Sequence, residues 1–293
     1  MNEINEFATY LKNVRNLSDA TIAAYSSDLR EFCAVMGFTD CVKEITLHDV
    51  ETVYIANLVA SGNCAASRSR KLSSVRMFYK WAVKNGIVQN NPVAEIEMPK
   101  IEKKTVKAMS FNEVEQVLDE AKKDSRENSF RDLAILSLMF STGIRRAELT
   151  EIKLSDLNLE ESLIVIHGKG NKDRLAYFND TTRAVLSEYI NVHRKFYCTS
   201  EKSNYLFVSD KREKLCLSTV NRIVNRYLES AGIKDKGFTA HSTRKAFATA
   251  VYENTGDILA VQQLLGHSSP STTQRYVGVA ESRKRMAAMT VNF

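Results

Sequence analysis

Beyond residue 140, four short segments are rich in the cationic and histidine side chains that bind phosphate. In chain order these segments read TGIRRAEL (142–149), GKGNK (168–172), HSTR (241–244) and LLGH (264–267). Tyr276 follows nine residues after the last segment. Each segment alone is a weak signal, since glycine beside lysine is usually a turn and His-x-x-Arg is usually a surface pair. Together and in this order, they predict phosphoryl transfer to a tyrosine.

Each cation has a task in such a reaction. A phosphodiester under attack develops charge on its non-bridging oxygens, and the planar guanidinium groups of Arg145 and Arg244 suit this charge without a metal ion. The departing 5′ oxygen needs a proton, which Lys169 on a hairpin loop is placed to supply once nearby arginines lower its pKa. Lys172 in the same loop is the second choice for this acid.

Tyr276 is the expected nucleophile. Because a phenol with a pKa of about 10 attacks poorly, a base and neighbouring cations must stabilise the phenolate. His241 and Arg244 lie at i and i+3 of an expected helix, so both can address one phosphate. A helix over residues 257–265, ended by a glycine, should present His267 at its end.

Helices and strands must position these four segments, and the sequence pattern after residue 107 predicts a domain of mixed helix and strand. Ser110 and Glu113 form a capping-box pattern that starts a helix. An apolar helix over residues 133–140 leads into the first cationic segment. Strands at 163–166 and 175–178 should form an antiparallel hairpin around the basic loop, and the remainder should be mostly helical.

The first hundred residues should form a helical bundle. Ser18 is a candidate N-cap between two helices, and two further helices are expected at residues 46–61 and 65–85, each followed by glycine. The first two helices are predicted from apolar stripes at helical spacing: Phe7, Tyr10, Leu11 and Val14, then Ile22, Tyr25, Leu29 and Phe32. Tyr79 and Trp81 on the last helix are expected in the core of this bundle rather than stacked on bases.

A polar, charged stretch with a proline, MPKIEKKTVK, divides the chain. We therefore expect a domain at residues 1–98, a linker at 99–107 and a second domain at 108–293 that includes a C-terminal tail. No run of about 18 apolar residues and no signal-peptide pattern occurs, which predicts a cytoplasmic protein without a membrane partner. Nucleoid association is expected as well if the protein binds DNA. The five cysteines are scattered and are expected to be reduced, with no zinc site.

The distribution of charge favours nucleic acid as a partner. The net charge is +6, and no carboxylate occurs between Glu51 and Glu95. The helix at 65–85 should therefore carry a basic face without internal acidic partners, which predicts contacts with DNA phosphates or bases. A solvated helix face is the alternative. The expected DNA-contact residues are Arg68, Arg76, Lys80 and Lys84.

The ordered motifs resemble those of the tyrosine recombinase family, which includes phage integrases and Xer recombinases. The resemblance extends to an S-x-x-T-x-x-x-Y-x-x-D-L motif at 18–29 and to the Asn-Pro before the linker. It implies a mainly α fold, with a SAM-like helical core-binding domain and a mixed α+β catalytic domain that holds a small antiparallel sheet. It also implies that the nucleophile Tyr276 is assisted by Arg145, Lys169, His241, Arg244 and His267, with Glu148 in a supporting role.

The chain departs from the family pattern in three places. Thr243 and Lys245 flank Arg244 where Xer-like segments usually read H-x-L-R-H, and Val-Gly-Val follows Tyr276 in place of a histidine-containing segment. These two departures favour a mobile-element integrase over a Xer recombinase. The third departure is that no additional arm-binding domain is expected, which favours a two-domain enzyme.

The expected function is site-specific cleavage and rejoining of DNA through a 3′-phosphotyrosine, in integration, excision or chromosome dimer resolution. No metal, ATP or other cofactor is expected. The alternatives are a type IB topoisomerase, which uses similar chemistry, and a non-catalytic DNA-binding accessory protein, against which the complete catalytic set argues.

The expected partners are paired double-stranded DNA sites and a homotetramer on them, with accessory proteins as further candidates. The tail after Tyr276 should dock on a neighbouring protomer, and packing on its own domain is the alternative.

Overall fold

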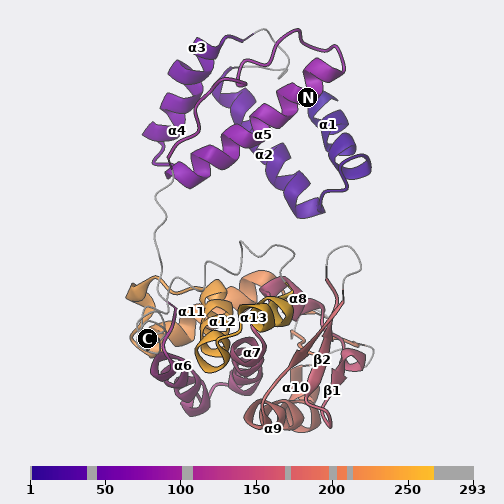
Figure 1. The fold of residues 1–293 in the computed structure, drawn as a ribbon, viewed down its shortest axis with the longest axis vertical. Helices are drawn as coiled ribbons and strands as arrows, with labels where there is room; N and C mark the ends of the chain where they lie inside the picture. The colour runs from indigo at the N-terminus through magenta and orange to yellow at the C-terminus, as the bar shows by residue number, and fades with distance from the viewer. Residues whose placement is uncertain are drawn as a thin grey trace, which may run out of the picture. The chain divides into compact units, whose positions relative to one another are not determined.

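The computed structural model describes residues 2–37, 45–100, 108–168, 173–197, 203–209 and 214–266 (Figure 1). The chain divides into two compact units, Met1–Lys104 and Thr105–Phe293. The expected linker at 99–107 falls mostly outside the described residues, so its bounds stay a prediction. In the described part of the chain, no helix is both long and apolar enough to cross a membrane.

The N-terminal unit is helical, as predicted. Its elements are α1 (Asn2–Asn13), α2 (Asp19–Val35), α3 (Leu47–Asp49), the π-helical segment η1 (Val50–Ile55), α4 (Ala56–Ala60) and α5 (Ala65–Lys84). Ser18 caps α2, because its side chain accepts a hydrogen bond from the Thr21 backbone N–H. Val14 lies beyond the end of α1 and is 69% exposed, so its predicted place in the apolar stripe is wrong.

Aromatic rings of α1 and α5 form the centre of this unit. Phe7 and Phe78 meet edge to face with ring centroids 5.4 Å apart, and Trp81 lies 5.8 Å from Phe78. Tyr79 and Trp81 are both buried, which agrees with their predicted core positions. Cys33 is disulfide-bonded, so the expectation that the cysteines are reduced is wrong at this position.

The second unit surrounds one apolar helix. Its helices are α6 (Phe111–Lys123), α7 (Ser129–Thr142), α8 (Arg146–Glu151), η2 (Leu154–Asp156), α9 (Asp180–Glu188), η3 (Tyr189–His193), α10 (Arg194–Tyr197), α11 (Leu217–Ser230), η4 (Lys234–Lys236), α12 (Ala240–Thr255) and α13 (Ile258–Leu265). The predicted capping box starts α6: the backbone N–H of Ser110 donates to Glu113 Oε2, and the backbone N–H of Glu113 donates to Ser110 Oγ. Helix α7 is buried along most of its length and packs against α6, α9 and α12.

A small antiparallel sheet completes the second unit. It runs in the order β1 (Leu157–Asn158), β2 (Leu163–Ile166), β3 (Arg174–Tyr177), with Ile166 paired to Arg174. The predicted hairpin is therefore present, with its second strand one residue earlier than expected. Strand β1 was not predicted, because two residues are too few to show an alternating pattern. The fold is mainly α with a small antiparallel sheet, as the sequence predicted.

Candidate active site

A glycine at the end of α7 allows three helices to meet. Gly143 has a φ of +61°, and a Cβ built there would lie 2.6 Å from Phe247 Cδ1 on α12 and 2.9 Å from Leu265 Cδ2 on α13. Both the left-handed backbone and the lack of space require glycine. The chain that leaves α7 is therefore held directly against α12 and α13.

Arg145 follows this junction at the N-terminus of α8 and is restrained by Glu148. Its backbone N–H donates to Glu148 Oε2 at 2.9 Å, and its Nη1 donates to Oε1 at 2.7 Å. The Glu148 side chain is only 11% exposed, whereas that of Arg145 is 44% exposed. The carboxylate thus restrains the orientation of a guanidinium group that stays accessible to a ligand.

Arg244 is buried beneath the same region and joins the ends of two helices. It is 2% exposed, and it donates from Nη1 to the Gly143 carbonyl at 2.6 Å and from Nη2 to the Leu265 carbonyl at 2.5 Å. Both carbonyls lie at helix C-termini, where a positive charge is favourable. Arg244 therefore stabilises the junction of α7 and α13 and also lines the pocket.

His241 lies in the first turn of α12, one turn before Arg244. Burial lowers the pKa of its imidazole, and the positive charges of Arg244 and Arg145 lower it further. A lowered pKa favours the neutral ring at neutral pH, and a neutral ring nitrogen can accept a proton. The cations of the site thus prepare His241 to act as an acceptor.

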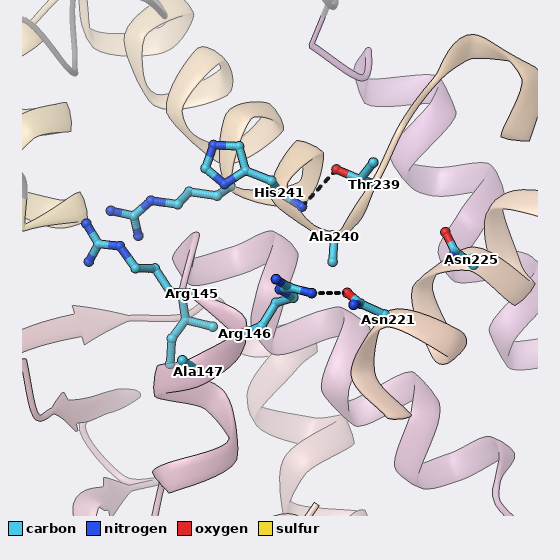
Figure 2. Close-up of a pocket in the computed structure, with 10 residues that line it drawn as sticks. Arg145, Arg146, Ala147, Asn221, Asn225, Thr239, Ala240 and His241 are labelled. Atoms are coloured by element: carbon cyan, nitrogen blue, oxygen red, sulfur yellow. Dashed lines mark hydrogen bonds between the residues drawn. The ribbon is translucent and has the colours of Figure 1, made fainter. Parts of the chain in front are cut away.

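Arg145, His241 and Arg244 line one pocket of about 590 Å³. Figure 2 shows the Arg145 side chain reaching toward the His241 side of the pocket, whereas Arg146 turns to Asn221 on α11, to which it donates a hydrogen bond. Within the described ranges, no three His, Cys, Asp or Glu side chains are grouped to hold a metal ion. The other lining residues are Ile144, Ala147, Asn225, Thr239 and Ala240.

Arg174 on β3 was missed by the sequence-based reasoning. Its Nη1 donates to Glu148 Oε1 at 3.0 Å and its Nη2 to Glu148 Oε2 at 2.7 Å, and both side chains are 11% exposed. Burial raises the pKa of Glu148, but hydrogen bonds from Arg174 and Arg145 outweigh this effect and lower it to about 2. The carboxylate is therefore ionised at neutral pH. In the sequence, Arg174 was marked only by its place at the end of the basic loop.

The remaining candidates Lys169, Lys172, His267 and Tyr276 lie outside the described residues. The start of the lysine loop is described, and it holds His167, whose Nδ1 lies 3.0 Å from Asp173 Oδ2. Hydrogen bonds to Asp173 and then Asp156 raise the pKa of His167. His167 therefore pairs with two carboxylates at the base of the hairpin loop.

The predicted DNA-contact residues of α5 differ in their surroundings. Lys80 and Lys84 are exposed, and Arg68 is half-buried. The guanidinium group of Arg76 instead donates to the Val93 carbonyl at 3.0 Å and to the Ile96 carbonyl at 2.5 Å. Arg76 thus holds the chain that follows α5, and contact with DNA at this position stays a prediction.

The expected lack of acidic partners for this basic stretch is wrong at two positions. Arg70 forms an ion pair with the buried Asp28, and Lys71 Nζ lies 2.6 Å from Glu31 Oε1. Both carboxylates belong to α2, so the partners are distant in sequence and were not visible in the local charge pattern.

Comparison with known proteins gives matches over nearly the whole chain. Residues 107–283 match the phage integrase family, and residues 4–86 match the SAM-like N-terminal domain of phage integrases. Tyrosine recombinase XerC of Lactobacillus leichmannii is 34% identical over 281 residues, which cover 94% of this chain and 93% of the relative. Tyrosine recombinase XerD of Staphylococcus haemolyticus is 34% identical over 284 residues, with 96% and 95% covered.

Solved structures show the same fold. The XerH site-specific recombinase bound to a palindromic difH substrate, in a post-cleavage complex, aligns with a TM-score of 0.76 at 22% identity, over 98% of this chain and 84% of that one. A lambda integrase dimer bound to a COC′ core site aligns with a TM-score of 0.74 at 19% identity, over 96% of this chain and 95% of that one.

Proposed function

The chain belongs to the phage integrase family and is a site-specific tyrosine recombinase, and we propose that its Arg145–His241–Arg244 pocket binds the DNA phosphate that Tyr276 attacks. The observation that carries this proposal is the convergence of the three side chains. They come from the start of α8 and from α12, almost one hundred residues apart, and they line one pocket. Two guanidinium groups and a neutral imidazole match the charge and proton demands of a phosphodiester under attack.

The reaction exchanges one phosphate ester bond for another. The Tyr276 oxygen forms a bond to phosphorus, the bond from phosphorus to the 5′ oxygen breaks, and a 3′-phosphotyrosine results. His241 takes the phenolic proton, and Lys169 protonates the leaving 5′ oxygen. The reverse steps, with a 5′ hydroxyl from another strand, rejoin the DNA. Because one ester is exchanged for another, no ATP is needed, and the two guanidinium groups supply the positive charge that a metal ion could otherwise provide.

Charge stabilisation is divided between the two arginines. Arg145 is exposed and offers its guanidinium to the non-bridging oxygens, with Glu148 fixing its orientation. Arg244 contributes positive charge from its buried position and connects the end of α13, directly before Gly266, to the segment that carries Arg145. His267, which lies outside the described residues, is expected to add a further phosphate contact.

The assembly follows from the chemistry. One protomer carries one set of catalytic residues and cuts one strand, whereas exchange between two duplexes needs four cuts, so we propose a homotetramer on paired sites. Its place of action is the nucleoid, with accessory proteins as further partners. The XerC and XerD relatives favour chromosome dimer resolution over element integration, despite the departures at Thr243 and Lys245.

A three-way assay tests this function. Genomic fragments retained by the protein identify the recombination site, which is then supplied as a duplex nicked near the cut so that cleavage is irreversible. A recombinase should form a covalent adduct on this duplex and should yield recombinant products only from plasmids with two sites. Relaxation of supercoiled plasmids without any site would indicate a topoisomerase, and binding without adduct would indicate an accessory protein.

A further inference from the structure

Arg174 connects three parts of the catalytic unit that carry separate motifs. It is the first residue of β3, two positions after the GKGNK segment of the hairpin loop. Its guanidinium group donates two hydrogen bonds, of 3.0 and 2.7 Å, to the carboxylate of Glu148 on α8. Such a bidentate pair fixes the relative orientation of its partners, which a single ion pair does not.

The stem of the same side chain covers the end of α13. Gly266 ends this helix with a φ of +62°, and a Cβ built there would lie 2.8 Å from Arg174 Cδ. The preceding carbonyl, that of Leu265, accepts the hydrogen bond from Arg244. Arg174 thus lies against the residue that directly precedes His267.

We propose that Arg174 is a positioning residue for strand cleavage, which sets Glu148, and through it Arg145, against strand β3 and the end of α13. This role rests on the proposed function, because it assigns Arg174 to the same active site. Arg174 is largely buried and acts through Glu148, so it is not itself a catalytic residue.

The charge balance at Glu148 shows why a second guanidinium is needed. The charged groups that contact Glu148 among the described residues are Arg145 and Arg174. With both present, one carboxylate is shared by two cations and the cluster keeps a net positive charge for phosphate. Without Arg174, a nearly buried carboxylate would have Arg145 as its one described charged partner, so it would be harder to ionise and would hold Arg145 less firmly.

The test compares Arg174→Met, Arg174→Lys and the surface control Arg183→Met, which removes an exposed arginine paired with Asp180 on α9. The readouts are the single-turnover cleavage rate at saturating enzyme on the nicked duplex, affinity for one half-site, and the melting temperature. Arg174→Met should lower the cleavage rate roughly 100-fold, the cost of a displacement near 1 Å, while half-site affinity stays unchanged. Arg174→Lys keeps the charge but loses the bidentate pair, and it should recover part of the rate.

The pH profile separates positioning from a merely structural role. Removing Arg174 removes the strongest hydrogen-bond donor that lowers the pKa of Glu148, so this pKa should rise in Arg174→Met. Its cleavage rate should then fall more steeply than that of the wild type as the pH is lowered from 7 to 5. The double variant Arg174→Met, Glu148→Gln, which has no carboxylate to titrate, should lose this extra pH dependence.

The outcomes are distinct. A cleavage rate for Arg174→Met equal to that of Arg183→Met would overturn the proposal, as would a slow rate with an unchanged pH profile. If Arg174→Met does not fold, Arg174→Lys supplies the same comparison, and wild-type cleavage in this variant would also overturn it. A wild-type protein that forms no adduct on the nicked duplex would instead contradict the proposed function, whatever the Arg174 variants do.

Discussion

Glu148 stands between two guanidinium groups, and its ionisation should be visible in the stability of the protein. Its pKa is lowered from 4.5 to about 2 in the folded state. A carboxyl group whose pKa is lower in the folded state than in the unfolded state stabilises the fold at pH values above its unfolded-state pKa. This contribution is lost as the pH falls through the folded-state pKa. Glu148→Gln should therefore lower the free energy of unfolding at pH 7 by on the order of 3 kcal/mol. The difference from wild type should shrink between pH 4.5 and about 2. Urea unfolding followed by circular dichroism measures both, and a difference that does not change with pH would contradict this account of Glu148.

Lys169 is expected to protonate the leaving oxygen. Lys169→Ala should therefore slow cleavage much more than binding. A substrate with sulfur in place of the bridging 5′ oxygen should restore much of the rate, because a thiolate leaves without a proton. Lys172→Ala is the matched control from the same loop. If Lys172→Ala is the variant that the sulfur substrate rescues, the two lysines have been assigned the wrong way round.

The sequence predicted the pocket side chains Arg145, His241 and Arg244, because the chemistry of phosphate transfer requires those residue types in ordered motifs. It did not predict Arg174. The pair between Arg174 and Glu148 joins residues 26 positions apart on a strand and a helix. Such a contact depends on how β3 packs against α8, and no local pattern in either segment shows it.

At the scale of elements, α5 is predicted to bind DNA through its exposed lysines. Lys80→Gln and Lys84→Gln should each weaken binding on all sequences and reduce the slope of log affinity against log salt by about one. Arg76→Gln should in addition lower the melting temperature, because Arg76 donates to the carbonyls of Val93 and Ile96. The control is Lys123→Gln on α6, an exposed lysine paired with Glu120. If the slope of log affinity against log salt is unchanged in the α5 variants, these lysines do not contact DNA and belong to a solvated helix face.

Helix boundaries were predictable where a local signal determines them. The caps at Ser18 and Ser110 depend on side chains within three residues of the helix start, and both form as expected. The ion pairs of Arg70 and Lys71 with α2 were not predicted, because they depend on the packing of two helices about forty residues apart. Local chemistry is thus visible in the sequence, whereas the partners of long side chains follow from the tertiary fold.

For the whole molecule, the segment after Tyr276 is expected to link neighbouring protomers. It lies outside the described residues, and its apolar side chains Met286, Met289, Val291 and Phe293 favour a docked position. Truncation after Ala280 should leave binding to a single half-site intact but remove cooperative binding and synapsis on paired sites. Mobility shifts on half and full sites measure this. Cooperativity that survives truncation would show that the tail packs on its own domain.

The most direct measurement of the central claim identifies the residue that is joined to DNA. After reaction with the nicked duplex and digestion by trypsin and nuclease, mass spectrometry should find a nucleotide on the peptide of residues 276–283, YVGVAESR. Tyr276→Phe removes only the attacking oxygen, so it should bind the duplex with wild-type affinity and form no adduct. An adduct that persists at wild-type level in Tyr276→Phe, or a nucleotide found on a peptide without Tyr276, would contradict the account.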